Sequence, residues 1–288
     1  MRSLSLLAEP ATLVWIQVGF AFVVGAMIGS FLNVVVYRLP RMLERQWQEE
    51  CAHLRDEPVA SQATYNLATP GSACPHCGHA IRWFENIPML SFALLRGCCN
   101  HCGASISGRY PLVEGFTALL SAFTVWHFGA NAMGLAALLL VWSLIALAFI
   151  DADTQLLPDN ITLPLLWMGL LWNLAGGFVP LEDAVIGAVA GYLVLWLVYH
   201  VFKLVTGKEG MGYGDFKLLA ALGAWLGWGL LPVIILASSV VGAVIGTAMI
   251  ALAGHDRAKP LPFGPYLALG GLIALFWGNV IVQTYLQP

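Results

Sequence analysis

The stretch ATLVWIQVGFAFVVGAMIGSFLNVVV, residues 11–36, contains no charged residue across 26 positions. A helix rises about 1.5 Å per residue and needs about 20 apolar residues to cross the hydrocarbon core of a bilayer. A cleaved signal peptide fits less well, because Glu9 and Pro10 interrupt the apolar stretch before it and no small-residue cleavage site is obvious. We therefore expect the stretch to be a permanent membrane anchor.

The rest of the chain has a similar composition. Of its 288 residues, 59% are hydrophobic and 10% are charged, whereas soluble domains carry about 25% charged residues. This composition predicts an all-α polytopic membrane protein with about eight transmembrane helices. The expected spans are 11–36, 111–128, 133–150, 161–178, 184–204, 216–228, 230–253 and 263–285. The sixth span is short and contains Gly223 and Gly227, so we expect it to be tilted, broken or placed where the bilayer is thin.

Basic residues indicate the orientation, because short cytoplasmic loops are enriched in Lys and Arg. With eight spans, every basic residue except Arg2 falls on one side, which we predict to be the cytoplasm. We expect three domains: an N-terminal transmembrane anchor at 1–37, a small cytoplasmic domain at 38–110 that holds all six cysteines, and a membrane core of about seven spans at 111–288. The basic residues follow this topology and form no stripe with stacking aromatic residues, so we expect no nucleic-acid partner.

Four of the six cysteines form two CxxC pairs, with 21 residues between them. Two such knuckles bring four thiolates to one tetrahedral zinc ion, and the glycine after each pair permits a tight turn. The predicted ligands are Cys74, Cys77, Cys99 and Cys102. Such a closed site leaves no position for water, so we assign the zinc a structural role.

Other interpretations of the cysteines remain open. A disulfide framework competes with zinc, although a cytoplasmic location favours the metal. Cys98 is able to replace Cys99 as a ligand, and three histidines are close enough in sequence to compete. These are His76, His79 and His101.

Two aspartates lie where an apolar run meets a polar loop. Asp151 follows the third span in the motif IDADTQLLPD, residues 150–159, and Asp215 enters the sixth span in GMGYGDFKL, residues 210–218. A carboxylate at a membrane boundary is costly and indicates a functional site. Two further carboxylates lie in the first motif. We interpret Asp153 as a solvated or substrate-binding residue and Asp159 as the N-cap of the next helix. For Asp215 an N-cap role is also open.

We predict that Asp151 and Asp215 form the acid–base pair of an aspartic protease. Two neighbouring carboxyl groups share a proton, activate one water and protonate the leaving amine. Desolvation favours the neutral form of Asp151 and a helix N-terminus favours the charged form of Asp215, so we expect Asp151 to act as the acid and Asp215 as the base. The alternatives are an ion- or proton-coupled transporter and a zinc-bearing scaffold without catalysis.

The chain resembles the type IV prepilin peptidases over nearly its whole length. The resemblance is carried by the two aspartate motifs, the paired CxxC knuckles, GSFLNVV at 29–35, GRYPLVE at 108–114 and PFGP at 262–265. It implies a multi-pass enzyme of the bacterial inner membrane with Asp151 and Asp215 as the catalytic pair. The implied substrates are type IV prepilins and type II secretion pseudopilins, cut at the cytoplasmic face of the bilayer.

The same resemblance implies a second activity, N-methylation of the new amino terminus from S-adenosylmethionine. Gly97 matches a family position linked to methylation, and Glu114 is a candidate to orient the donor or the amine. Both have alternative interpretations, Gly97 as a turn glycine and Glu114 as a first-turn carboxylate favoured by the helix dipole.

Overall fold

The computed structural model describes residues 11–57, 63–253 and 261–285, and within these ranges it is helical and contains no strand. The all-α expectation is therefore confirmed. Arg2, Arg257 and Lys259, which contributed to the predicted orientation, lie outside the described residues. The chain divides into two compact units, Met1–Gly134 and Leu135–Pro288.

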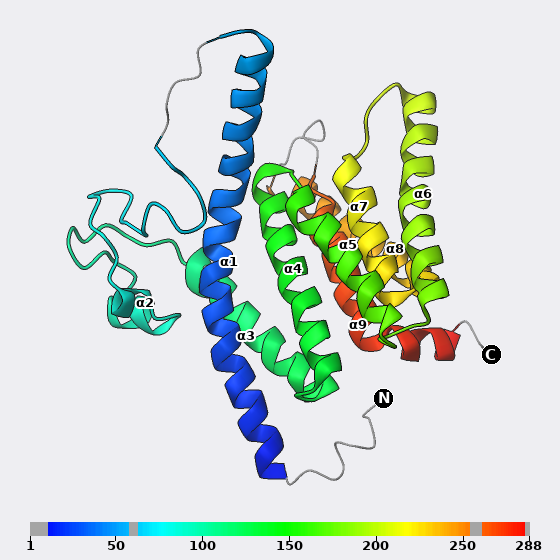
Figure 1. The fold of residues 1–288 in the computed structure, drawn as a ribbon, viewed down its shortest axis with the longest axis horizontal. Helices are drawn as coiled ribbons and strands as arrows, with labels where there is room; N and C mark the ends of the chain where they lie inside the picture. The colour runs from blue at the N-terminus through cyan, green and yellow to red at the C-terminus, as the bar shows by residue number, and fades with distance from the viewer. Residues whose placement is uncertain (1–10, 58–62, 254–260, 286–288) are drawn as a thin grey trace. The chain divides into compact units, whose positions relative to one another are not determined.

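The first unit is built on a long helix, α1 (Ala11–Leu54), which packs along α3 (Arg109–Phe128) (Figure 1). With 44 residues, α1 runs well past the predicted anchor boundary at residue 37, and it is longer than a bilayer crossing requires. Small residues let the two helices approach closely. A Cβ atom at Gly29 would lie 2.7 Å from the Cα atom of Glu114, so glycine is needed at this position.

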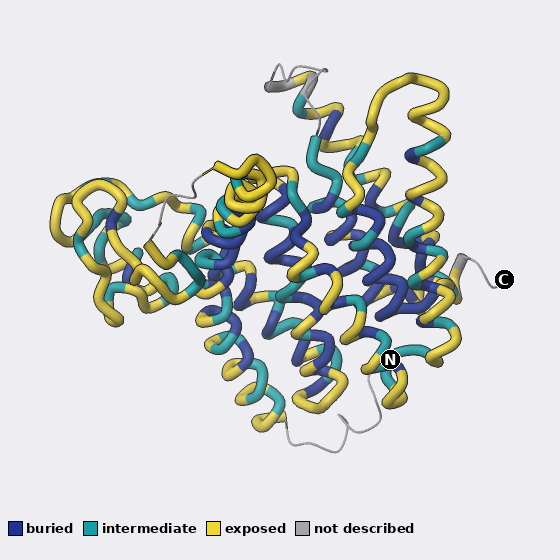
Figure 2. The backbone as a smooth tube through the Cα atoms, turned by 45° about the horizontal axis from the view of Figure 1, so that its top comes forward, coloured by how far each residue is buried: buried dark blue, intermediate teal, exposed yellow. Residues whose placement is uncertain are grey.

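Between α1 and α3 lies a loop-rich segment with two short helices, η2 (Trp83–Asn86) and α2 (Leu90–Leu94). Much of this segment is exposed, whereas buried positions concentrate inside the helical bundles (Figure 2). Such a segment has little apolar core of its own, so its fold depends on polar contacts and on its cysteines.

Among the described residues, the second unit consists of six helices, of which α4 begins just before the unit boundary, and one short 3₁₀ turn. They are α4 (Ala132–Thr154), α5 (Asp159–Leu174), α6 (Leu181–Thr206), α7 (Tyr213–Leu226), η3 (Trp228–Leu230), α8 (Leu231–Ala253) and α9 (Gly264–Tyr285).

The eight long helices correspond to the eight expected spans, but they differ in their ability to cross a bilayer. Among the described residues, five helices combine sufficient length with sufficient apolar composition: α1, α4, α6, α8 with η3, and α9. The other three are α3, α5 and α7, with 20, 16 and 14 residues.

Helix α7 is both short and enclosed by other parts of the unit. From Asp215 to Leu226 every residue except Lys217 is buried. It ends at Gly227, whose φ of +79° suits glycine, and Asn173 donates hydrogen bonds to the carbonyl groups of Ala224 and Trp225 at 2.8 and 3.1 Å. Asn173 thus satisfies carbonyl groups that the end of the helix leaves unpaired.

Close packing of α6 on α7 is expected to be sensitive to a single methyl group. A Cβ atom at Gly223 would collide with the backbone of Gly187 on α6, so Gly223→Ala should lower the melting temperature of the purified protein, even though alanine favours helix by about 1 kcal/mol. Gly229→Ala is the matched control, because a Cβ atom there meets open space. An unchanged or higher melting temperature for Gly223→Ala would contradict this packing.

Candidate active site

Asp151 lies in the last turn of α4 and is buried, with 5% of the residue exposed. The first backbone N–H of α9, from Gly264, donates a hydrogen bond to its Oδ2 atom at 2.8 Å. A Cβ atom at residue 264 would lie 2.7 Å from the same oxygen, so only glycine allows this approach. The N-terminus of α9 therefore holds the carboxyl group of Asp151 and offsets part of the cost of burying its charge.

Asp215 lies in the first turn of α7 and is 6% exposed. Its side chain does not cap the helix, and its Oδ1 atom is buried without a hydrogen-bond partner among the described residues. Burial, followed by the nearby negative charge of Asp151, raises the pKa of Asp215 to about 7. Asp215 is therefore suited to carry a proton near neutral pH.

The two aspartates belong to the same unit, and their loops are in contact. A Cβ atom at Gly214 would lie 2.7 Å from Cβ of Leu157, so the glycine-rich entry to α7 packs against the loop that follows α4. Lys217 adds a second link, because its Nζ atom lies 2.7 Å from both carboxylate oxygens of Asp159. These contacts hold the beginnings of α5 and α7 together beside the aspartate pair.

The remaining acidic residues of the first motif take other places. The N-cap of α5 is Pro158, so the N-cap prediction for Asp159 is wrong: Asp159 is the first residue of the helix and pairs with Lys217. Asp153 is exposed and lies within α4, because that helix continues through the motif to Thr154.

In the first unit, four sulfur atoms form a compact cluster. The Sγ atoms of Cys74, Cys77, Cys99 and Cys102 all lie within 4.8 Å of one another. This cluster contains neither Cys98 nor a histidine, and the six cysteines form no disulfide. Gly78 and Gly103, with φ near +70°, each donate an N–H to the carbonyl of the first cysteine of their knuckle. Four thiols so arranged fit tetrahedral zinc.

Negative charge is shared unequally within this cluster. Backbone N–H groups of Cys77 and then His76 lower the pKa of Cys74 to about 6. The N–H of His79 acts in the same direction on Cys77, but burial and the three neighbouring sulfurs outweigh it and raise the pKa of Cys77 to about 12. A metal must therefore displace at least one proton to bind four thiolates.

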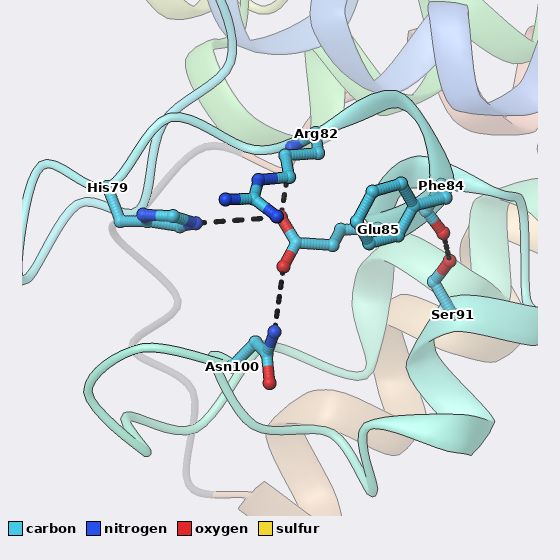
Figure 3. A network of polar contacts seen from close by, with 6 residues as sticks. All are labelled: His79, Arg82, Phe84, Glu85, Ser91 and Asn100. Atoms are coloured by element: carbon cyan, nitrogen blue, oxygen red, sulfur yellow. Dashed lines mark hydrogen bonds and ion pairs between the residues drawn. The ribbon is translucent and has the colours of Figure 1, made fainter.

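Glu85 stabilises the segment that carries the cysteines, a role that no sequence motif indicates. Its Oε2 atom accepts the backbone N–H of Arg82 at 2.9 Å, and its Oε1 atom accepts an N–H of Asn100 at 3.0 Å (Figure 3). His79 lies 3.6 Å from the same carboxylate. The N–H of Arg82 first, then Asn100, lower the pKa of Glu85. His79 follows the first knuckle, and Asn100 lies within the second. Glu85 therefore links the two knuckles.

Glu114 and Gly97 belong to the first unit, and the two aspartates belong to the second. Glu114 is buried near the start of α3, where its Oε2 atom accepts the N–H of Met89 at 2.7 Å. Gly97 has a φ of +70° and donates its N–H to the carbonyl of Phe92 at 2.9 Å, which is the geometry of a turn glycine.

Comparisons with known proteins agree over both units. Residues 23–128 match the family model described as bacterial peptidase A24 N-terminal domain, and residues 138–247 match the type IV leader peptidase family. A protein of Aeromonas hydrophila is 59% identical over 274 residues, which is 94% of each chain. One of Pseudomonas aeruginosa is 59% identical over 91% of each chain, and one of Burkholderia pseudomallei is 52% identical over 91% of this chain and 86% of its own. All three bear the name prepilin leader peptidase/N-methyltransferase, and no solved structure matches the chain.

We expect the purified protein to contain about one zinc ion per chain at neutral pH and to lose it as the pH falls, because protons then compete for the four thiolates. Elemental analysis after dialysis at stepped pH measures this. Cys102→Ser should lose zinc, whereas Cys98→Ser, its control outside the sulfur cluster, should keep it. The opposite pattern would identify a different ligand set.

Proposed function

Because the chain belongs to the type IV leader peptidase family, we propose that it removes the leader of type IV prepilins and type II secretion pseudopilins with Asp151 and Asp215 as its catalytic pair. The observation that carries this proposal is the burial of both carboxyl groups in one unit, close enough for the charge of one to raise the pKa of the other. Aspartic proteases need such a pair, because one group must be charged while the other keeps a proton. The named relatives are peptidases, and nothing favours a transporter.

The contacts support a division of roles opposite to the one expected from sequence. The N-terminus of α9 favours a charged Asp151, and the buried, unpartnered oxygen of Asp215 favours a proton there. Sequence alone suggested the reverse, because the Gly264 contact comes from a segment 113 residues away. The proton belongs to the pair, and we place it at rest on Asp215.

Hydrolysis then proceeds in two steps, each with two proton transfers. Asp151 takes a proton from a water molecule as the water oxygen attacks the scissile carbonyl carbon, and Asp215 gives its proton to the carbonyl oxygen. When the C–N bond breaks, the leaving nitrogen takes the proton held by Asp151, and the proton on the former carbonyl oxygen returns to Asp215. The pair regains its initial protonation, and one water has been consumed.

We place this chemistry at the cytoplasmic face of the bacterial inner membrane. The supporting argument is the distribution of basic residues, since Lys203, Lys208 and Lys217 lie in or near the loop between the fifth and sixth expected spans, on the same predicted side as Asp151 and Asp215. A prepilin whose apolar helix lies in the bilayer would present its leader junction at this boundary. The lipid bilayer is then a partner in positioning the substrate.

The second activity we propose is methylation of the amino group that cleavage exposes, with S-adenosylmethionine as the donor. The names of the relatives support this proposal, because they include N-methyltransferase. The amine nitrogen attacks the methyl carbon, the S–C bond breaks to leave a neutral thioether, and the nitrogen loses one proton. Glu114 is the residue that we propose faces the donor. Gly97 acts indirectly, through the position of its neighbours.

Replacing either aspartate with asparagine should abolish leader cleavage, because asparagine neither takes nor gives the required proton. Asp151→Asn and Asp215→Asn are to be incubated with a purified prepilin and the leader removal followed by electrophoresis. Glu182→Gln, an exposed carboxylate on α6 in the same unit, is the matched control and should cleave like the wild type. Full cleavage by either asparagine variant would reject the mechanism.

Gly264→Ala should lower kcat more than it changes KM, because its methyl group would push Asp151 out of place. In the wild type, the pKa of Asp215 is raised to about 7, so cleavage should decline as the pH rises through this value and Asp215 loses its proton. Moving Asp151 away weakens the charge that raises this pKa, so the alkaline limb of Gly264→Ala should shift to lower pH. A loss of activity without this shift would indicate only general misfolding, and Gly229→Ala provides the control.

A further inference from the structure

A cavity of about 610 Å³ lies in the first unit. Every residue that lines it belongs to Met1–Gly134, and its wall combines α1, the segment around η2 and α2, and the first turns of α3. Small-molecule sites commonly have volumes of about 300–1,000 Å³. The cleavage mechanism makes no use of this space.

A buried carboxylate faces the cavity. Glu114 is 8% exposed, the N–H of Met89 donates to its Oε2 atom at 2.7 Å, and the hydroxyl of Ser30 also donates to this carboxylate. These donors hold the side chain in one position and offset part of the cost of burying it. Arg38 also lines the cavity, and its guanidinium donates to the carbonyl groups of Asn66 and Leu67 at 3.0 and 3.4 Å. The carboxylate of Glu114 is the group in this wall that attracts the positively charged part of a ligand.

Aromatic side chains provide a second attraction for a cation. Tyr37, Phe92 and Tyr110 line the cavity, and ring faces attract cations and stack against planar bases. Gly97 does not line the cavity, but a Cβ atom there would lie 3.0 Å from the ring of Phe92. Glycine at this position therefore leaves the ring of Phe92 its room.

We propose that this cavity binds S-adenosylmethionine, with Glu114 attracting its positive charge and the aromatic residues contacting its adenine. The inference rests on the methyl transfer proposed above and assigns that reaction a place. The ligand fits in chemical terms, since it combines a sulfonium cation, a planar base and a polar ribose. Asn33 and other amide and hydroxyl groups of the wall supply hydrogen bonds for the polar parts.

Charge selectivity distinguishes this site from a merely structural role of Glu114. S-adenosylhomocysteine, the product, has the same shape but a neutral sulfur. Glu114→Gln, which keeps an acceptor for the N–H of Met89, should weaken binding of S-adenosylmethionine on the order of tenfold and change binding of S-adenosylhomocysteine much less.

The experiment is equilibrium binding of both compounds to the purified full-length protein. Val34→Phe, which narrows the cavity from α1, should weaken binding of both, whereas Glu49→Gln, an exposed carboxylate near the end of α1, should bind like the wild type. Zinc content of each variant reports whether the first unit has folded. In the wild type alone, photochemical crosslinking of labelled S-adenosylmethionine should mark peptides from residues 30–38 or 86–114.

The outcomes separate this inference from the proposed function. If the wild type binds S-adenosylmethionine but folded Glu114→Gln and Val34→Phe bind it equally well, the donor site lies elsewhere and the inference is overturned. Crosslinks confined to the second unit would overturn it too, even if a variant failed to fold. If the wild type binds neither compound, the methyl transfer itself is rejected.

Discussion

Two buried carboxyl groups in an almost uncharged bundle are the constraint on which the second unit depends. Neither aspartate is neutralised by a basic residue in the contacts described; Lys217, which is close in sequence to Asp215, pairs with Asp159. The cost of burying two acids is instead reduced by a backbone N–H at Asp151 and, at Asp215, by a pKa raised to about 7, which lets this group hold a proton near neutral pH. A cation at this position would hold both groups ionised and remove the acid that hydrolysis requires.

The helices and the cysteine cluster could be predicted because their signals are local. Uncharged runs of sufficient length identified the long helices, and CxxC spacing identified the four sulfurs that gather within 4.8 Å. The catalytic candidates could be selected by their position at the edge of apolar runs. These inferences need only the residues within one element and elementary knowledge of water and lipid.

The rest depends on contacts between distant parts of the chain. The assignment of acid and base rests on Gly264, which meets Asp151 across 113 positions, and no local pattern reveals that meeting. In the sequence, nothing distinguishes Glu85 from an ordinary exposed glutamate. Its role is visible only in the fold, which brings His79 and Asn100 to its carboxylate. Asp159 is of a residue type that favours helix N-caps, but its ion pair with Lys217 overrides that preference.

Two residues of α7, eight positions apart, make contacts that depend on their orientation. Asp215 lies near Asp151, and Gly223 packs against Gly187. One inserted or deleted residue between them would turn one end by about 100° relative to the other. An insertion or deletion in this segment would therefore break one of the two contacts, whereas exchange of its other side chains for ones of similar volume would keep both. Insertions are tolerable in the exposed loop that precedes it, from Gly207 to Gly210.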